Sequence, residues 1–219
     1  MEISPQDEGR LLLIDKPFEW TSFDVVNKLR FKLKIKKIGH AGTLDPLATG
    51  LLIICVGKMT KRIEEYMGLE KEYTGKFVIG QTTPSHDLET EVSEKKDISH
   101  ITPSQIQEVV KPLTGKINQL PPLHSAIKVG GKRAYQFARK GKELELKPRE
   151  VEIREFEITG INLPEISFRI VCSKGTYIRS IARDFGDMLG VGAYLSQLCR
   201  TRIGNYKLED ALTIDEVTA

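Results

Sequence analysis

The chain has 219 residues, of which 29% are charged and 40% hydrophobic, and its formal net charge is +3. This composition is ordinary for a globular protein that buries a real core. No apolar run approaches the length of a membrane span, which excludes a protein with membrane-spanning helices. The acidic, polar first residues do not resemble a secretory signal, which excludes a secreted protein with such a signal.

The cysteines and histidines give no indication of a metal centre. Cys55, Cys172 and Cys199 are isolated from one another, and the four histidines are scattered along the chain. Structural metal sites need closely spaced ligands of these types. We therefore expect no metal, and we expect buried thiols in a reducing compartment, which means a cytoplasmic protein.

The first elements are a buried strand and a capped helix. Residues 11–14 form a continuous apolar run, which predicts a strand. Thr21 and Asp24 have the spacing of a capping box, so a helix is expected to begin there, with Trp20 packing against its first turns. Residues 30–37 then alternate basic and apolar side chains. This alternation predicts either a half-buried strand with a solvated face or a cationic lip that contacts phosphates, and the two are compatible.

Residues 39–52 form the most informative stretch, Gly-His-Ala-Gly-Thr-Leu-Asp-Pro-Leu-Ala-Thr-Gly-Leu-Leu. The glycines around His40 let the backbone turn sharply and approach a ligand closely. Asp45 precedes Pro46, which disfavours helical geometry. A carboxylate on an irregular loop among leucines is typical of a reactive group on a rigid scaffold. Alternatively, Asp-Pro is simply a turn and the glycines are loop residues.

The middle of the chain predicts strands at residues 51–56 and 72–80, an exposed loop at 81–96, and a helix that begins after Thr102 and ends near residue 111. Tyr73 on the second strand is on this evidence a half-buried aromatic residue. His86 is predicted to be a loop residue and not a catalyst.

A basic segment follows at residues 125–149. Gly130-Gly131 predicts a hairpin, and residues 133–140 predict a small helix capped by Gly141. Eight lysines and arginines stand in the segment against Glu143 and Glu145. The alternatives are a solvated helix face and an RNA-binding surface, and the density of charge favours RNA.

The last third predicts strands at residues 151–159 and 166–172, then a helix capped by Thr176 that runs to residue 189. Arg179 and Arg183 lie one turn apart on this helix. Without other information they are two solvated arginines on a surface helix.

Four strings together identify a family. Residues 39–52 closely resemble the catalytic loop of the bacterial tRNA pseudouridine-55 synthases, the TruB family. The Lys-Pro…Trp-Thr-Ser string before it, Lys-Gly-Thr-Tyr-Ile-Arg at 174–179 and residues 195–202 resemble further motifs of that family. The resemblance covers residues 10–217.

The resemblance implies a fold and a domain organisation. We expect an α+β pseudouridine synthase fold with a mixed, largely antiparallel central sheet flanked by helices. Residues 1–219 are expected to form a single catalytic domain, with residues 125–149 as an inserted RNA-binding thumb. We expect no C-terminal RNA-binding (PUA) domain, either because the chain is truncated or because it is a natural short form.

The resemblance also implies roles for individual residues. Asp45 is the expected nucleophile, paired with Arg179, and Tyr73 is expected to act with them at the target uracil. The expected substrate-binding residues are His40, Tyr73, Tyr177 and Leu198. His40 is a candidate wedge in the space that a flipped base leaves, or alternatively a structural loop histidine. The expected RNA-backbone contacts of the thumb are Lys128, Lys132, Arg133 and Arg139. Cys199 departs from the basic residue that the family pattern suggests, so no phosphate contact is assigned to it.

The implied reaction breaks the bond between N1 and C1′ of uridine 55 in the tRNA T loop and joins C1′ to C5. Because no group is donated and no oxidation state changes, no cofactor is needed. Asp45 attacks covalently, or stabilises developing charge on the sugar, or acts as a base. The expected partner is the T stem-loop of tRNA, bound by a monomer. Two alternatives remain, an RNA-binding or tRNA-folding protein without catalysis, and a guide-RNA-dependent rRNA synthase subunit.

Overall fold

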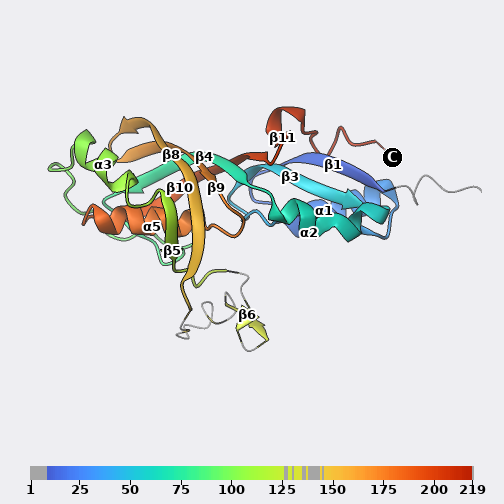
Figure 1. Ribbon diagram of the computed structural model, residues 1–219, viewed down its shortest axis with the longest axis horizontal. Helices are drawn as coiled ribbons and strands as arrows, with labels where there is room; N and C mark the ends of the chain where they lie inside the picture. Colours follow the sequence, from blue (N-terminus) through green and yellow to red (C-terminus); the bar gives the residue numbers. More distant parts are fainter. Residues whose placement is uncertain are drawn as a thin grey trace, which may run out of the picture. The chain divides into compact units, whose positions relative to one another are not determined.

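The computed structural model describes residues 9–125, 128–129, 131–134, 137, 144 and 146–218 (Figure 1). The chain divides into two compact units. The first unit consists of Met1–Thr74 and Gln197–Ala219, and the second of Gly75–Ser196. Strands β4 (Lys71–Ile79) and β10 (Ala193–Ile203) contribute residues to both units.

The sheet of the first unit has the strand order β1-β3-β10-β4. Its other strands are β2, which pairs with β3, and β11, which pairs with β10. β1 and β3 are antiparallel, and β10 runs parallel to β3. The bounds are β1 (Arg10–Lys16), β2 (Ile38–His40), β3 (Thr49–Val56) and β11 (Tyr206–Lys207).

Helix α1 (Ser22–Leu33) begins at the predicted capping box. The Thr21 side chain accepts a hydrogen bond from the amide of Asp24, and the Asp24 carboxylate accepts one from the amide of Thr21. The helix runs four residues into the segment predicted as a strand, so that prediction is wrong. Leu33 completes the apolar stripe of the helix and is buried, and Lys34 ends the helix in a left-handed conformation.

The core of the first unit lies on both faces of β3. Leu52, Ile54 and Val56 pack with α1, whereas Leu51, Ile53 and Cys55 pack with α2 (Ile63–Gly68) and with Ile203. Because side chains alternate along a strand, a continuous apolar run fits a strand that is covered on both faces. The short helices η1 (Gly57–Arg62) and η2 (Leu208–Asp210) complete this unit.

The sheet of the second unit has the order β10-β4-β9-β8-β5. β8 pairs antiparallel with both β9 and β5. The elements are β5 (Gly115–Gln119), β8 (Arg149–Asn162), β9 (Glu165–Cys172), α3 (Pro103–Val110) and α5 (Ile178–Met188). With β10 parallel to β3, the sheet pairing is mixed and mostly antiparallel, which confirms the α+β prediction.

Four phenylalanines form the centre of the second unit. Phe77 of β4 stacks on Phe168 of β9 with ring centroids 4.2 Å apart, and Phe185 of α5 lies 5.4 Å from Phe77. Phe156 of β8 closes the cluster. Gly186 lets α5 approach Ala193 closely, because an added Cβ would collide with the backbone there. The C-terminal half of α5 therefore packs closely against the start of β10.

A separate antiparallel pair of β6 (Lys128–Val129) and β7 (Lys132–Arg133) confirms the predicted hairpin, and Gly130 itself lies outside the described residues. The predicted helix at residues 133–140 lies largely outside the described residues. No helix in the described part of the chain is both long and apolar enough to cross a membrane.

Candidate active site

The predicted catalytic loop connects β2 to β3 and has no regular structure between residues 41 and 48. Leu44 and Ala48 are buried on either side of Asp45, which is itself partly exposed. The amide of Ala48 donates to the carbonyl oxygen of Asp45 at 3.1 Å, which closes a turn around Pro46. The loop thus holds a partly exposed Asp45 between two buried apolar residues, and the irregular loop with buried Leu44 agrees with the prediction.

Ser22 fixes the backbone immediately before Asp45. Its hydroxyl accepts a hydrogen bond from the amide of Leu44 at 2.9 Å and donates to the carbonyl oxygen of Leu44 at 3.2 Å. Ser22 is the first residue of α1 and is 2% exposed. The capped helix therefore serves the catalytic loop as a rigid support.

Lys16 fixes the backbone immediately after Asp45. Its side chain is fully buried, and its ammonium group donates to the carbonyl oxygens of Trp20 at 2.6 Å, Pro17 at 2.8 Å and Pro46 at 3.3 Å. Burial lowers the pKa of Lys16 to about 8, an effect that the nearby negative charge of Asp45 partly offsets and that Arg200 reinforces. An ammonium group that is buried and bonded to three carbonyl oxygens is held in one place by the fold.

The other site residues predicted in the first unit are His40, Tyr73 and Leu198. His40 ends β2, and burial, aided by the charge of Arg200, lowers its pKa. Its Nδ1 is buried and has no hydrogen-bond partner among the described residues. A neutral imidazole with an unused polar edge suits contact with a nucleobase. Tyr73 on β4 is 8% exposed, and Leu198 on β10 is partly exposed.

Arg179 lies in the second unit and is 3% exposed, so the alternative of a solvated surface arginine is wrong. Its guanidinium donates to the carbonyl oxygen of His124 at 3.0 Å, and Nε lies 3.5 Å from Oδ2 of Asp87. No role for Asp87 follows from the residue pattern alone. Its buried carboxylate partly balances the charge of Arg179 and holds it beside the loop that follows β4. The predicted pairing of Arg179 with Asp45 stays a prediction.

The loop at residues 81–96 is not fully exposed, contrary to the prediction. Thr83, Ser85 and Asp87 are buried, and the hydroxyls of Thr83 and Ser85 both donate to the carbonyl oxygen of Asp87. Polar residues are buried here because the loop satisfies its own hydrogen bonds. His86 has a φ of 63°, and burial together with Arg183 and Arg179 lowers its pKa to about 4. His86 is therefore neutral at physiological pH.

Tyr177 is the N-cap residue of α5, although the sequence predicted Thr176 as the cap. The hydroxyl of Thr176 donates instead to the carbonyl oxygen of Ser173. Buried Gln119 of β5 accepts from the amide of Tyr177 at 2.8 Å and donates to its carbonyl oxygen at 3.1 Å. The guanidinium of Arg149 lies 4.6 Å from the centre of the tyrosine ring. The backbone of Tyr177 is thus fixed by Gln119 of β5, and its ring packs against Arg149 of the neighbouring strand β8.

The thumb residues are only partly described. Lys128, Lys132 and Arg133 belong to the β6–β7 hairpin by their backbones, but their side chains lie outside the described residues, as does Arg139 entirely. In the described part of the chain, no group of three or more His, Cys, Asp or Glu residues is arranged to hold a metal ion.

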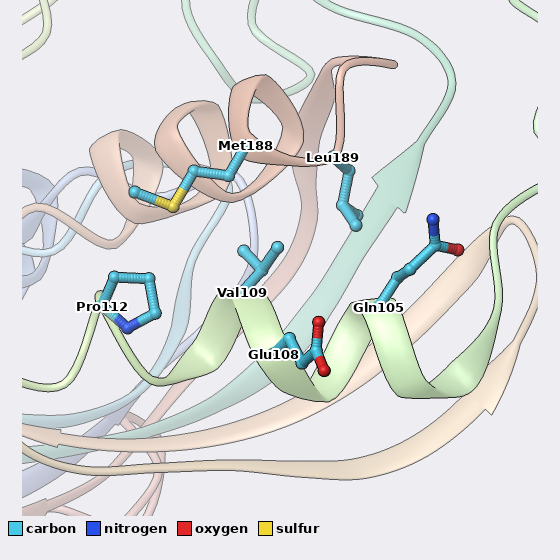
Figure 2. A pocket seen from close by; sticks show the side chains of 6 residues that line it. All are labelled: Gln105, Glu108, Val109, Pro112, Met188 and Leu189. Atoms are coloured by element: carbon cyan, nitrogen blue, oxygen red, sulfur yellow. The ribbon is translucent and has the colours of Figure 1, made fainter.

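Figure 2 shows a shallow pocket elsewhere on the second unit, between α3 and the end of α5. It is lined by Gln105, Glu108, Val109, Pro112, Met188 and Leu189. None of the predicted site residues lines it, and its only titratable group is one carboxylate, so it offers no catalytic arrangement.

Comparison with solved structures defines the class of protein. The chain is similar to one of the proteins in a crystal structure of a Cbf5-Nop10-Gar1 complex, with 30% identity and a TM-score of 0.75, over 96% of this chain and 53% of that one. The chain thus spans about half the length of that protein. It also shares its fold with a crystal structure of a pseudouridylate synthase, with a TM-score of 0.51, 15% identity and coverage of 95% of this chain and 69% of that one. The fold is that of the pseudouridine synthases.

Sequence comparison then gives the family. The model described as "TruB family pseudouridylate synthase (N terminal domain)" matches residues 30–178, and that of the "tRNA pseudouridylate synthase B C-terminal domain" matches residues 179–219. A curated tRNA pseudouridine synthase B of Flavobacterium johnsoniae is 56% identical over 214 residues, 94% of this chain and 93% of the relative. The chain belongs to the TruB family, which confirms the resemblance.

Proposed function

We propose that this chain is a tRNA pseudouridine synthase that isomerises uridine 55 of the T loop. The observation that carries the proposal is the near-complete match, at 56% identity, to a curated tRNA pseudouridine synthase B. The anchored loop around Asp45 supports it, because a nucleophile must be held in a fixed position to be effective.

In the proposed reaction, the bond from N1 to C1′ breaks and a bond from C5 to C1′ forms. N1 gains a proton and C5 loses one, so atoms balance with no other reactant. Asp45 attacks the substrate or stabilises the developing positive charge at the sugar. Arg179 pairs with Asp45 and keeps it ionised, and Asp87 together with the carbonyl oxygen of His124 orients Arg179.

The uracil must leave its stack before it can react, at a cost of about a few kcal/mol. His40 fills the vacated space, and Tyr73 and Leu198 enclose the base together with Tyr177. The basic thumb residues Lys128, Lys132, Arg133 and Arg139 bind the RNA backbone. The protein acts as a monomer in the cytoplasm on the T stem-loop of tRNA, and this isomerisation needs no metal or redox cofactor.

The proposal is tested by mapping pseudouridine in a full-length tRNA transcript after incubation with the purified chain. Carbodiimide modification followed by primer extension marks each pseudouridine as a stop. We expect one new stop, at position 55, and none in a transcript that carries cytidine there. Stops at other positions, with none at 55, would contradict the proposed site.

The guide-RNA-dependent alternative draws on the similarity to a protein in the Cbf5 complex. A synthase of that kind needs a guide and partner proteins, so it leaves a bare tRNA transcript unmodified. A pure RNA-binding protein binds the transcript but also leaves it unmodified. Activity of the chain alone therefore separates the proposal from both alternatives.

A further inference from the structure

A second buried cation, Arg200, underlies the loop of Asp45. Arg200 belongs to the part of β10 in the first unit, and its side chain is 1% exposed. Burying a charged side chain costs several kcal/mol unless its donors are satisfied. An apolar side chain could be buried at this strand position without that cost in free energy. The buried guanidinium therefore indicates a specific structural or functional role.

The guanidinium bridges the two ends of the catalytic loop. Nε donates to the carbonyl oxygen of Leu51 at 2.8 Å, and Nη2 donates to the carbonyl oxygen of Gly42 at 3.1 Å. Gly42 precedes Asp45 by three residues, and Leu51 follows it by six. A planar guanidinium with donors in a fixed fork suits two acceptors at a set separation, which an ammonium group does not.

The backbone around Arg200 is adapted to this contact. In the parallel pairing of β10 with β3, Arg200 lies opposite Gly50, which has a φ of 100°. An added Cβ at Gly50 would lie 2.8 Å from the amide nitrogen of Arg200 and would also collide with its carbonyl oxygen. Gly42 has a φ of 103°, and its Cβ position is 3.7 Å from Nη1. Two glycines in left-handed conformations thus allow the loop to close on the arginine.

The charge of Arg200 also acts inside the site. It contributes to the lowered pKa of His40 and to that of Lys16. Among the described residues, its hydrogen bonds go only to neutral carbonyl oxygens and it has no carboxylate within ion-pair distance. The positive charge is therefore not cancelled by an adjacent anion and is free to act on the groups around Asp45.

We infer that Arg200 is a positioning residue for pseudouridine formation. By donating hydrogen bonds to the carbonyl oxygens of both Gly42 and Leu51, it fixes the position and orientation of Asp45. The inference rests on the proposed function. Arg200 is assigned an indirect role. It acts through the loop, together with Ser22 and Lys16, which hold the residues on either side of Asp45.

The test compares Arg200→Lys with Arg202→Lys as a matched control. Arg202 lies on the same strand but bonds the carboxylate of Glu70 and the carbonyl oxygen of Gly204, away from the loop. A misplacement of about 1 Å at a catalytic group costs about 100-fold in rate. We expect Arg200→Lys to lower the single-turnover rate on saturating tRNA by about 100-fold with its tRNA affinity unchanged, and Arg202→Lys to leave both unchanged.

Hydrogen exchange of the amides in residues 41–51 provides a readout that a general loss of stability does not mimic. We expect faster exchange in this loop for Arg200→Lys and unchanged exchange in β8 and β9, which lie in the other unit. A single-turnover rate equal to that of Arg202→Lys, or a loop that exchanges as in the wild type, would overturn the inference.

If Arg200→Lys does not fold, Gly42→Ala tests the same contact from the loop. It leaves Arg200 in place and strains the residue whose carbonyl oxygen Arg200 binds. We expect a reduced single-turnover rate with unchanged tRNA affinity, and a wild-type rate overturns the inference. If the wild type itself forms no pseudouridine, the proposed function fails and the inference with it, whereas failure of the inference alone leaves wild-type activity intact.

Discussion

Lys16 brings a titratable charge into the core directly beneath the catalytic loop. Its pKa falls from 10.5 to about 8 on folding, chiefly because of burial. Between these two pH values the unfolded chain binds the proton and the folded chain does not, so folding is favoured as pH rises. Below pH 8 the protein bears the full cost of the buried charge, about 3 kcal/mol at about 1.4 kcal/mol per pKa unit.

The first prediction concerns the variant Lys16→Met. The difference in free energy of unfolding between wild type and variant is expected to shift by about 2 kcal/mol in favour of the wild type between pH 7.5 and pH 10. Urea denaturation at both pH values measures it. Lys58→Met, at an exposed lysine, serves as the control. A difference that does not change with pH would show that Lys16 has an ordinary pKa in the folded protein.

Single residues also mark the limit of what the sequence predicted in the site. The string around Asp45 predicted an irregular loop with apolar anchors, and the structure has both. Ser22, Lys16 and Arg200, which hold that loop, received no individual role, although Lys16 and Ser22 stand in the Lys-Pro…Trp-Thr-Ser string that resembles a family motif. Their bonds to the loop go to backbone groups far away in the chain, and no local residue pattern predicts such contacts. For Arg200 the nearest signal was Cys199, where a basic residue was expected, one position before the buried arginine.

Among the elements, α5 depends on an unusual support at its N-cap residue, Tyr177. No side chain caps the helix at Tyr177, and Gln119 takes up both its amide and its carbonyl group. Removing Gln119 leaves the amide of Tyr177 without its partner, which costs about 1–3 kcal/mol. The carbonyl oxygen of Tyr177 still accepts hydrogen bonds from the amides of Ser180 and Ile181.

The second prediction follows from this support. Gln119→Ala is expected to lower the free energy of unfolding by about 1–3 kcal/mol, because the amide of Tyr177 loses its partner. Gln197→Ala, at an exposed position of β10, is the matched control and is expected to change it by about 0.5 kcal/mol or less. Chemical denaturation of both variants measures the effect. Equal stabilities would mean that water replaces the Gln119 side chain without cost.

The elements with strong local signals were predicted correctly, and those set by distant contacts were not. The capping boxes at Thr21 and Thr102 and the apolar run of β3 fix their elements from nearby residues. The alternation at residues 30–37 predicted a strand, but the apolar stripe of α1 extends to Leu33 and overrides it. The start of α5 was placed one residue early because Gln119, which supports Tyr177, comes from another strand.

On the scale of the whole molecule, the basic thumb is the expected determinant of RNA affinity. The third prediction is that reversing charge at Lys132, Arg133 and Arg139 together weakens tRNA binding. It is also expected to reduce the slope of log affinity against log salt by about 2–3, since each lost phosphate contact removes roughly 0.9.

The control for this prediction reverses three exposed lysines elsewhere, Lys111, Lys116 and Lys207, so that the net charge changes equally. Filter binding over a salt titration compares the two triple variants. If both variants lose the same affinity and slope, general charge and not the thumb determines RNA binding.

The family resemblance also operates at this scale. It predicted the fold class and the family, and both are confirmed by the sheet topology and by the comparisons. The roles of individual residues, including the pairing of Arg179 with Asp45, remain predictions. Asp45 and Arg179 belong to two different units, and no local sequence pattern fixes the distance between such residues.

The central claim is that Asp45 carries out the isomerisation of uridine. The most direct measurement is tritium release from a tRNA transcript labelled at C5 of uridine, with wild type compared with Asp45→Asn. Formation of the new carbon–carbon bond must expel the hydrogen at C5. We expect release of about one tritium per tRNA by the wild type and none by the folded variant. Release by Asp45→Asn at the wild-type rate, or none by a wild type that still binds tRNA, would contradict it.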